Sequence, residues 1–364
     1  MNTPPPATVV FHPRTEPVVL GAGETLLEAA QRTGLRVPHS CRGGNCGSCR
    51  MTLLAGAVDY PRFAPLTPPG LIGATPGLAP GAVEVLACQA VPRGDVQVEP
   101  RELRRAGEVE VKKLPCRVAR CETLSPGVLG LWLRLPAAEP LEFHAGQYVN
   151  LWLGDGRQRS FSIAAPPHAS ALVEVHIRES ASMTASGVLA TLHEGSLLTI
   201  EGPHGVLGSE VDTGAANHGT ANNAAAEKTP VVLVAGGTGY APMQALLWHW
   251  LESGTQRPVV LYWGVRAAED LYRDAWLRER AARFTQFRYV PVLSAAAEAD
   301  SADLRRGFVH EAVREDWPAL CAGGFTPEVV AAGPTVMVEA LRLALSELAA
   351  AGYPVGPLTC DAYG

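Results

Sequence analysis

Apolar and polar residues alternate over short stretches in the first two hundred positions of the chain. The short β-rich stretches "TVVF", "VEVLACQA" and "DVQVEP" predict strands. Between the first and second of them, a short helical pattern runs from Gly23 to Gly34, with the glycine at its end acting as a stop signal. Short strands mixed with one helix predict a small α+β domain over residues 7–100.

A second series of alternations predicts a β-rich domain over residues 108–207. Its strands are expected at "LGLWLRL", "GQYVNLWL", "RSFSIAAP", "LVEVHIR" and "LLTIEGP". Several short strands at close spacing indicate an antiparallel barrel or sandwich. The one helical pattern in this region is "TASGVLATLHEG". The preceding stretch, residues 101–120, carries seven Lys or Arg against three Glu, and we interpret it as a solvated linker and edge strand, with a docking strip for an acidic partner as the alternative.

From residue 230 onwards the pattern changes to buried apolar runs that alternate with helical stretches. Examples are "PVVLVAGGTGYAPMQALLWHWLESG", "PVVLYWGV", "FRYVPVLS" and "EVVAAGPTVMVEALRLALSELAAAG". This rhythm predicts a doubly wound parallel sheet over residues 230–364. Residues 209–229 show no apolar period and are expected to form a mobile inserted loop.

Composition narrows the choice of partners. Of the 364 residues, 47% are hydrophobic and 18% charged, which is ordinary for globular domains. A net charge of −6 gives no reason to expect binding to nucleic acid or to an anionic membrane. No apolar run approaches the roughly 18 residues of a membrane span, and the first ten residues lack the pattern of a signal peptide. The expected location is therefore a reducing cytoplasm.

Four of the eight cysteines stand in a metal-binding pattern. Cys41, Cys46 and Cys49 follow C-x4-C-x2-C spacing within the glycine-rich "CRGGNCGSCR", and Cys88 comes after 38 intervening residues. This is the plant-type 2Fe–2S pattern, in which one tightly curled loop supplies three thiolates. Glycines permit the curl and let backbone N–H groups approach the sulfurs. Zinc is the alternative, but structural zinc sites use paired cysteine knuckles rather than a lone fourth ligand.

A candidate flavin motif lies in the second region. The stretch "HAGQYVNLWL" precedes "RQRSFSIAAPP", and this pairing resembles the flavin-binding domain of the ferredoxin–NADP reductase superfamily. The resemblance implies that the strand Arg159-Ser160-Phe161-Ser162 binds FAD. Arg159 would contact phosphate, Phe161 would pack beside the flavin, and Ser162 would lie near the reactive N5. Phe161 replaces the commoner Tyr, so one hydroxyl hydrogen bond of ~0.5–1.5 kcal/mol is missing.

The same resemblance assigns a phosphate loop to "MTASGVLATL". Thr184, Ala185 and Ser186 would contact an anion at the start of a helix. Ser186 has an alternative interpretation as a simple helix N-cap. The pair of glycines that often precedes this loop is replaced by Ser180-Ala181-Ser182.

The third region carries a nicotinamide motif. Gly236, Gly237, Thr238 and Gly239 follow an apolar strand and open a helix, the place where a dinucleotide diphosphate meets helix N–H groups. A tight turn without ligand is the alternative. The resemblance adds Arg266 on the adenosine side, and it adds the strand end Gly333, Pro334 and Met337. Ala332 stands where many relatives carry Cys. No cluster of basic residues indicates a 2′-phosphate, so NADH is expected, with NADPH as the alternative.

The end of the chain, "CDAYG", falls where relatives place an acidic residue and an aromatic ring over the flavin. Asp361 and Tyr363 are therefore candidates for a role beside the flavin together with Ser162, and a frayed terminus is the alternative.

The order of the three regions resembles iron–sulfur flavoprotein reductases of the ferredoxin–NADP reductase superfamily, including phenol hydroxylase, benzoate dioxygenase and CDP-6-deoxy-Δ3,4-glucoseen reductases. It implies a β-grasp-like ferredoxin domain, an antiparallel flavin-binding β-barrel and a nicotinamide-binding domain. Electrons would pass from NAD(P)H through FAD and 2Fe–2S to a separate oxygenase or hydroxylase. A deoxysugar dehydratase as acceptor, or a redox sensor, are the alternatives. A flavin is required because nicotinamide gives two electrons together and a cluster accepts one.

Overall fold

The structure is a computed structural model, and it divides into two compact units. Unit 1 comprises residues 1–110 with 361–364, and unit 2 comprises residues 111–360. The residues that the structure describes are 7–13, 15–33, 35, 37, 49–61, 83–100, 109–154, 156–169, 171–179, 189–205, 207–208, 229–295 and 304–363. Each unit is considered by itself.

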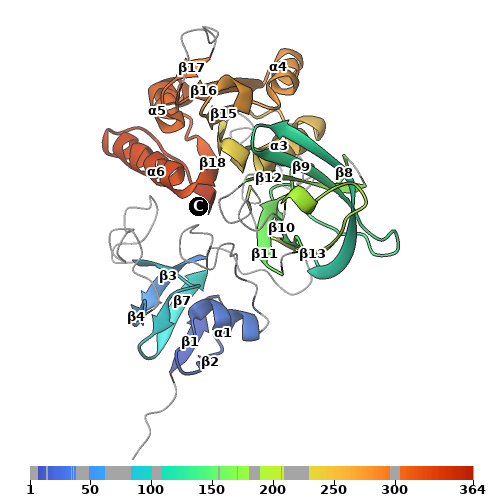
Figure 1. Cartoon of the computed structure of the whole chain (residues 1–364). Coiled ribbons are helices and arrows are strands. Elements are labelled where there is room, and N and C mark those ends of the chain that lie inside the picture. Colours follow the sequence, from blue (N-terminus) through green and yellow to red (C-terminus); the bar gives the residue numbers. More distant parts are fainter. Residues whose placement is uncertain are drawn as a thin grey trace, which may run out of the picture. The chain divides into compact units, whose positions relative to one another are not determined.

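Unit 1 is built on a five-stranded mixed sheet in the order β2-β1-β7-β3-β5 (Figure 1). Its elements are β1 Thr8–Phe11, β2 Val18–Val19, α1 Leu26–Arg32, β3 Arg50–Ala55, β4 Val58–Asp59, β5 Val83–Leu86, β6 Val91–Pro92 and β7 Val96–Pro100. Strands β1 and β7 are parallel, whereas the other neighbours in this sheet are antiparallel. Strands β4 and β6 form a separate two-stranded ribbon.

The helix α1 starts where its sequence provides a cap. The Thr25 side chain accepts a hydrogen bond from the Glu28 backbone, and the Glu28 carboxylate accepts one from the Thr25 backbone, which completes a capping box. The helix then buries Leu26, Leu27 and Ala30 against the sheet. The short helix that the sequence predicts in this region is therefore present.

Unit 2 begins with a six-stranded antiparallel sheet in the order β11-β10-β13-β8-β9-β12. Its elements are β8 Lys112–Ser125, β9 Val128–Arg134, β10 Tyr148–Trp152, β11 Gln158–Ser162, β12 Leu172–Arg178, the 3₁₀ helix η1 Leu189–Thr191 and β13 Leu197–His204. An antiparallel bridge links Ile163, just after the edge strand β11, to Val175 in the middle of the other edge strand, β12, so the sheet curls back on itself.

The expected edge strand within residues 101–120 is wrong. Strand β8 lies between β13 and β9 in the interior of the sheet. Leu114, Cys116 and Val118 alternate into the core of this sheet, while Lys113 and Arg117 at the alternate positions are exposed, which explains the polar appearance of the stretch. Residues 101–108 lie outside the described part of the chain.

A second six-stranded sheet follows along the chain, ordered β17-β16-β15-β14-β18-β19 (Figure 1). Its elements are β14 Val231–Gly236, η3 Gly237–Gly239, α3 Tyr240–Glu252, β15 Val259–Val265, η4 Ala268–Asp270, α4 Asp274–Arg283, β16 Phe287–Leu293, β17 Arg305–Arg306, α5 Val309–Leu320, β18 Glu328–Pro334, α6 Thr335–Ala350 and β19 Leu358–Tyr363. Strands β14 to β18 pair in parallel.

Helices cover both faces of this second sheet. Val231, Leu233 and Ala235 of β14 pack in one core with residues of α3 and α4, whereas Val232 and Val234 pack in another with residues of α5 and α6. Burial on both faces explains why the strands appear as continuous apolar runs in the sequence. No helix in the described residues is both long and apolar enough to cross a membrane.

Two predictions concern segments that are only partly described. The expected mobile loop over residues 209–229 lies outside the described residues except for Thr229. Of the helix expected over residues 184–195, the structure describes only residues 189–195, where η1 is a single 3₁₀ turn.

Candidate functional site

Two of the four predicted iron ligands lie in the described part of unit 1. Cys49 directly precedes β3 and Cys88 follows β5, and these strands pair with Arg50 opposite Leu86. The Ala87 amide donates to the Cys49 carbonyl over 3.0 Å. The two thiols are 1% and 8% exposed. Segments far apart in the sequence therefore carry two buried cysteines at adjoining strand ends, whereas Cys41 and Cys46 lie outside the described residues.

The surroundings of these cysteines fit a metal centre. The Tyr60 hydroxyl accepts a hydrogen bond from the Leu86 amide at 3.0 Å. Burial raises the pKa of Tyr60, and the nearby Cys49 and Cys88 thiols add to this rise. Tyr60 therefore stays neutral and adds no negative charge beside the two buried cysteines. Thiolate sulfur is the ligand that an iron–sulfur cluster uses.

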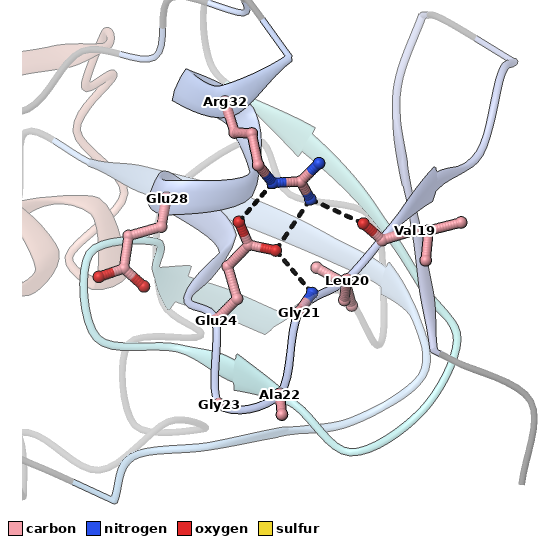
Figure 2. A pocket seen from close by; sticks show the side chains of 8 residues that line it. All are labelled: Val19, Leu20, Gly21, Ala22, Gly23, Glu24, Glu28 and Arg32. Atoms are coloured by element: carbon pink, nitrogen blue, oxygen red, sulfur yellow. Dashed lines mark hydrogen bonds and ion pairs between the residues drawn. The ribbon is translucent and has the colours of Figure 1, made fainter. Parts of the chain in front are cut away.

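Unit 1 also contains an open groove, away from the strand ends that carry the two cysteines in the sequence. Val19–Glu24 with Glu28 and Arg32 line an open groove of about 640 Å³ (Figure 2). The Glu24 carboxylate binds the Arg32 guanidinium over 2.8 Å and accepts the Gly21 amide over 2.8 Å. Arg32 also donates to the Val19 carbonyl over 2.7 Å. These groups close the loop onto the end of α1, so the groove has a structural explanation and we assign it no cofactor.

The predicted flavin strand is β11, and its register places its residues opposite β10. Ser162 lies opposite Tyr148, Phe161 opposite Val149 and Ser160 opposite Asn150. The hydroxyl of Ser160 donates to the Asn150 side chain over 2.8 Å, so this serine has an intramolecular role. Phe161 packs partly buried against the core of the sheet. The predicted strand is present, whereas contacts to a flavin stay predictions.

Thr184, Ala185 and Ser186 of the predicted phosphate loop lie outside the described residues. The loop follows β12, which ends at Arg178, and precedes η1. Their role therefore stays a prediction.

The predicted nicotinamide segments meet at the carboxyl edge of the second sheet. A Cβ atom on Gly236 would lie 2.9 Å from Pro334 Cδ, and one on Gly333 would lie 2.7 Å from Met337 Cε. One on Gly239 would overlap the carbonyl of Ala332. These glycines let the turn after β14 touch the turn after β18, which is a packing requirement that the sequence alone does not reveal.

Gly237 differs from its neighbours in this turn. Its φ is +54°, in the left-handed region, and the nearest atoms to a Cβ there would belong to the Arg178 guanidinium. The Trp263 indole donates to the Gly237 carbonyl over 3.0 Å, which fixes this peptide. The turn leads into α3, whose N-terminus attracts anions. Among the three glycines of the motif, Gly237 is therefore the one that the packing leaves available to a ligand.

The remaining predicted residues lie at the edges of the same sheet. Arg266 follows the last residue of β15 and is exposed, and its carbonyl accepts the Ala295 amide over 2.9 Å. Asp361 and Tyr363 belong to β19 and are half-buried, so the end of the chain is a strand and not a frayed terminus. The roles of all three stay predictions. Ala332 is buried in the core on the α3 side.

Sequence reasoning missed a polar set on β12. Glu174 and His176 are 5% and 4% exposed, although both can carry charge. The segment "LVEVHIR" alternates apolar and polar residues, and such alternation normally indicates one face in water. The available signal was the combination of an acid and a base at alternate positions of one strand.

Comparison with protein families finds three matches along the chain. Residues 10–93 match the "2Fe-2S iron-sulfur cluster binding domain", residues 115–208 the "Oxidoreductase FAD-binding domain" and residues 233–342 the "Oxidoreductase NAD-binding domain". The chain is therefore an NAD(P)H-dependent iron–sulfur flavoprotein oxidoreductase with 2Fe–2S, FAD and NAD-binding domains.

The chain belongs to the family of reductases that join these three domains in one polypeptide. It is 30% identical to the CDP-6-deoxy-L-threo-D-glycero-4-hexulose-3-dehydrase reductase of Yersinia pestis, covering 92% of each chain. It is also 30% identical to the terephthalate 1,2-dioxygenase reductase component 2 of Comamonas sp., covering 90% of this chain and 89% of that one. The crystal structure of Amycolatopsis cytochrome P450 reductase GcoB matches with a TM-score of 0.67 and 30% identity over 98% of each chain.

Proposed function

We propose that this protein delivers electrons from NADH to the catalytic component of an oxygenase or hydroxylase. That electrons pass from NAD(P)H by way of FAD and a 2Fe–2S cluster to a separate partner follows from the three domains and the relatives. The observation that carries the proposal is the presence of all three domains over nearly the whole chain. Among the relatives, the Comamonas protein serves a dioxygenase, and the Amycolatopsis protein is named a cytochrome P450 reductase.

A deoxysugar dehydratase as acceptor is the second candidate. The Yersinia relative is named for a hexulose dehydrase, at the same 30% identity as the Comamonas protein. The two candidates share the electron path and differ only in the partner. A redox sensor is the third candidate, and sustained turnover with NADH would exclude it.

We further propose the residues that hold each cofactor. Cys41, Cys46, Cys49 and Cys88 would ligate the cluster, supported by the two buried cysteines at adjoining strand ends. Arg159, Ser160, Phe161 and Ser162 would hold FAD, with Thr184, Ala185 and Ser186 on its phosphates and Asp361 and Tyr363 beside its ring. Gly236, Gly237, Thr238 and Gly239 would bind the nicotinamide dinucleotide together with Arg266, Gly333, Pro334 and Met337.

The chemistry explains why three cofactors are needed. When bound, FAD takes two electrons at once and releases them singly to a one-electron acceptor such as a 2Fe–2S cluster. The chain's own contribution is positioning, because the turns after β14 and β18 meet at one sheet edge where a dinucleotide can lie against the N-terminus of α3.

Finer features of the fold and location are part of the proposal. The mixed sheet of unit 1 is assigned to the β-grasp-like type, the curled antiparallel sheet to a barrel, and the helix-covered parallel sheet to the doubly wound type. Cys116, Cys121, Cys321 and Cys360 form no disulfide, which suits a reducing compartment such as the cytoplasm.

Reconstitution with each candidate partner tests the acceptor. The purified reductase is reduced with NADH under anaerobic conditions and mixed with an oxygenase component or with a hexulose dehydrase. We expect fast reoxidation of the reductase by the oxygenase component, with product formation when oxygen is admitted. Fast reoxidation by the dehydrase alone would contradict the proposal and favour the second candidate.

A further inference from the structure

Unit 1 buries an ion pair on the two strands that carry the described cysteines of the cluster site. The Arg50 guanidinium lies 3.1 Å from the Glu84 carboxylate, and these side chains are 9% and 2% exposed. In the Arg93–Asp59 pair of the same unit, by contrast, the arginine is 66% exposed. Arg50 and Glu84 are therefore shielded from the water that screens the other pair.

A gain in stability does not by itself explain a buried ion pair. Both groups lose their hydration, and two apolar side chains of similar volume are often equally stabilising. A buried pair does, however, act strongly on any neighbouring group whose charge changes, because little water screens it. We therefore expect the role of the pair to lie with a neighbour that gains or loses charge.

The register of the sheet places this pair next to the two buried cysteines. Arg50 directly follows Cys49 and lies opposite Leu86. Cys88 comes two residues after Leu86, beyond the end of β5. Glu84 lies two positions further along the β3–β5 ladder, away from the cysteines. Along the ladder, the order is therefore the cysteines, then the arginine, then the carboxylate.

Tyr60 shows that the charges of these residues act at one place. Its hydroxyl accepts the Leu86 amide over 3.0 Å, at the residue that lies opposite Arg50. Burial is the main cause of the raised pKa of this hydroxyl, and the Leu86 hydrogen bond opposes it. The Cys49 and Cys88 thiols raise the pKa further, whereas Arg50 lowers it. The positive charge of Arg50 therefore acts where the two thiols do.

Reduction of a cluster held by these cysteines would change the charge at this place. Reduced FAD gives up one electron, the cluster gains it, and the net charge of the cluster becomes more negative by one. A nearby positive charge favours the more negative form, and a nearby negative charge opposes it. Because Arg50 is the nearer member of the pair, its effect should exceed that of Glu84.

We propose that the buried Arg50–Glu84 pair raises the reduction potential of the 2Fe–2S cluster, with Arg50 favouring the reduced form and Glu84 holding the guanidinium and limiting its effect. The inference rests on the proposed function, which assigns Cys49 and Cys88 as ligands of the cluster. A higher potential draws the electron from the flavin to the cluster, and so favours transfer towards the acceptor. Neither residue is a ligand in this account, and both act through their charge.

An anaerobic redox titration of the holoprotein, followed by electron paramagnetic resonance, measures the effect. The signal of the reduced cluster is recorded against the applied potential, which gives a midpoint for the cluster alone. We expect Arg50→Gln to lower the ratio of reduced to oxidised cluster about 10-fold at the wild-type midpoint, a fall of about 59 mV. Glu84→Gln should raise the midpoint, because it leaves the guanidinium unopposed. Arg50→Lys keeps the charge and should shift the midpoint less than Arg50→Gln.

Two further variants control for exposure and for misfolding. Arg93→Gln is the matched control, because Arg93 pairs with Asp59, the residue before Tyr60, but water and salt screen its charge. Its midpoint should equal that of the wild type. The double variant Arg50→Met with Glu84→Leu removes both charges without leaving one of them buried and unpaired. Its midpoint should lie between those of Arg50→Gln and the wild type.

Opposite shifts in Arg50→Gln and Glu84→Gln are the result that a purely structural role would not produce. Shifts in the same direction, unchanged midpoints, or loss of the cluster from every variant of the pair would contradict the proposal. An equal shift in Arg93→Gln would contradict the assignment to the buried pair. If Cys88→Ser kept the wild-type signal, the ligand assignment itself would be wrong. Loss of that signal in Cys88→Ser, together with an unchanged midpoint in Arg50→Gln, would refute the present inference alone.

Discussion

A single added methyl group distinguishes packing glycines from ligand-facing ones in the nicotinamide turn. In Gly239→Ala the new Cβ would lie 2.8 Å from the Gly333 amide nitrogen and closer still to the Ala332 carbonyl. Ordinary van der Waals contact begins at about 3.5 Å, and these are backbone atoms of a core strand and its end. In Gly237→Ala the nearest atom would be 3.5 Å away, and only the positive φ opposes the substitution.

The two substitutions should therefore lower the free energy of unfolding by different amounts. Overpacking against the backbone at Gly239 should lower the free energy of unfolding by about 3 kcal/mol. For a unit of this size, that corresponds to a fall in melting temperature of about 6–12 °C. Alanine in the left-handed region at Gly237 costs about 1 kcal/mol, or about 2–4 °C. Gly237→Ala should therefore fold and show its main defect in dinucleotide binding.

Calorimetric melting of the holoprotein, followed by ADP-ribose titration, measures both effects. Gly254→Ala is the matched control for Gly237→Ala, since Gly254 has φ of +79° and no atom within 4 Å of its Cβ position. It should show the same small loss of stability and normal binding. If Gly239→Ala melted within about 2 °C of the wild type, the close approach of the two turns would be refuted.

Three further predictions concern other parts of the molecule. Burial raises the pKa of Cys116 to about 12, so iodoacetamide at about pH 8 should leave this thiol unmodified in the native protein but label it in urea, as mass spectrometry can show. Arg50→Met removes the partner of the Glu84 carboxylate, 3.1 Å away and only 2% exposed, and should lower the free energy of unfolding by about 3 kcal/mol in a urea titration; an unchanged midpoint would contradict the buried ion pair. His176 has a folded-state pKa below its usual 6.5, so the stability it contributes is complete above that pH and is lost as the pH falls below it, because the unfolded chain takes up the proton first. His176→Gln should therefore show a shallower loss of stability with acid than the wild type, and equal slopes would contradict the neutral buried ring.

The pattern of apolar residues was sufficient to predict most of the strands and helices of the fold. Continuous runs such as 231–236 became the central strands of the parallel sheet because both faces are covered by helices. The four cysteines and the three motifs were sufficient for the family, since metal and phosphate binding impose local spacing that is visible in one chain. Segments that meet only in space, such as the Gly236 and Gly333 turns, were linked through resemblance rather than by the residues themselves.

The features that sequence reasoning did not predict have physical explanations. Strand β8 was interpreted as an edge because its outward residues are basic, yet strands on both sides pair with it. The alternation in β12 normally indicates one face in water, yet Glu174 and His176 are buried, and Glu174 pairs with Arg273 from a distant segment of the chain. A sequence shows which residues are polar, but not whether a partner from a distant segment replaces water. The same limit hid Arg178, whose position over Gly237 depends on how two sheets pack.

The central claim is that one chain holds a two-electron flavin and a one-electron cluster ligated by Cys88. Anaerobic titration with dithionite, followed by visible absorbance, tests it most directly. The wild type should take up about three electrons per chain, two in the flavin and one in the cluster. Cys88→Ser should take up about two, with normal bleaching of the flavin by NADH. Uptake of three electrons by the variant, or of only two by the fully loaded wild type, would contradict the account.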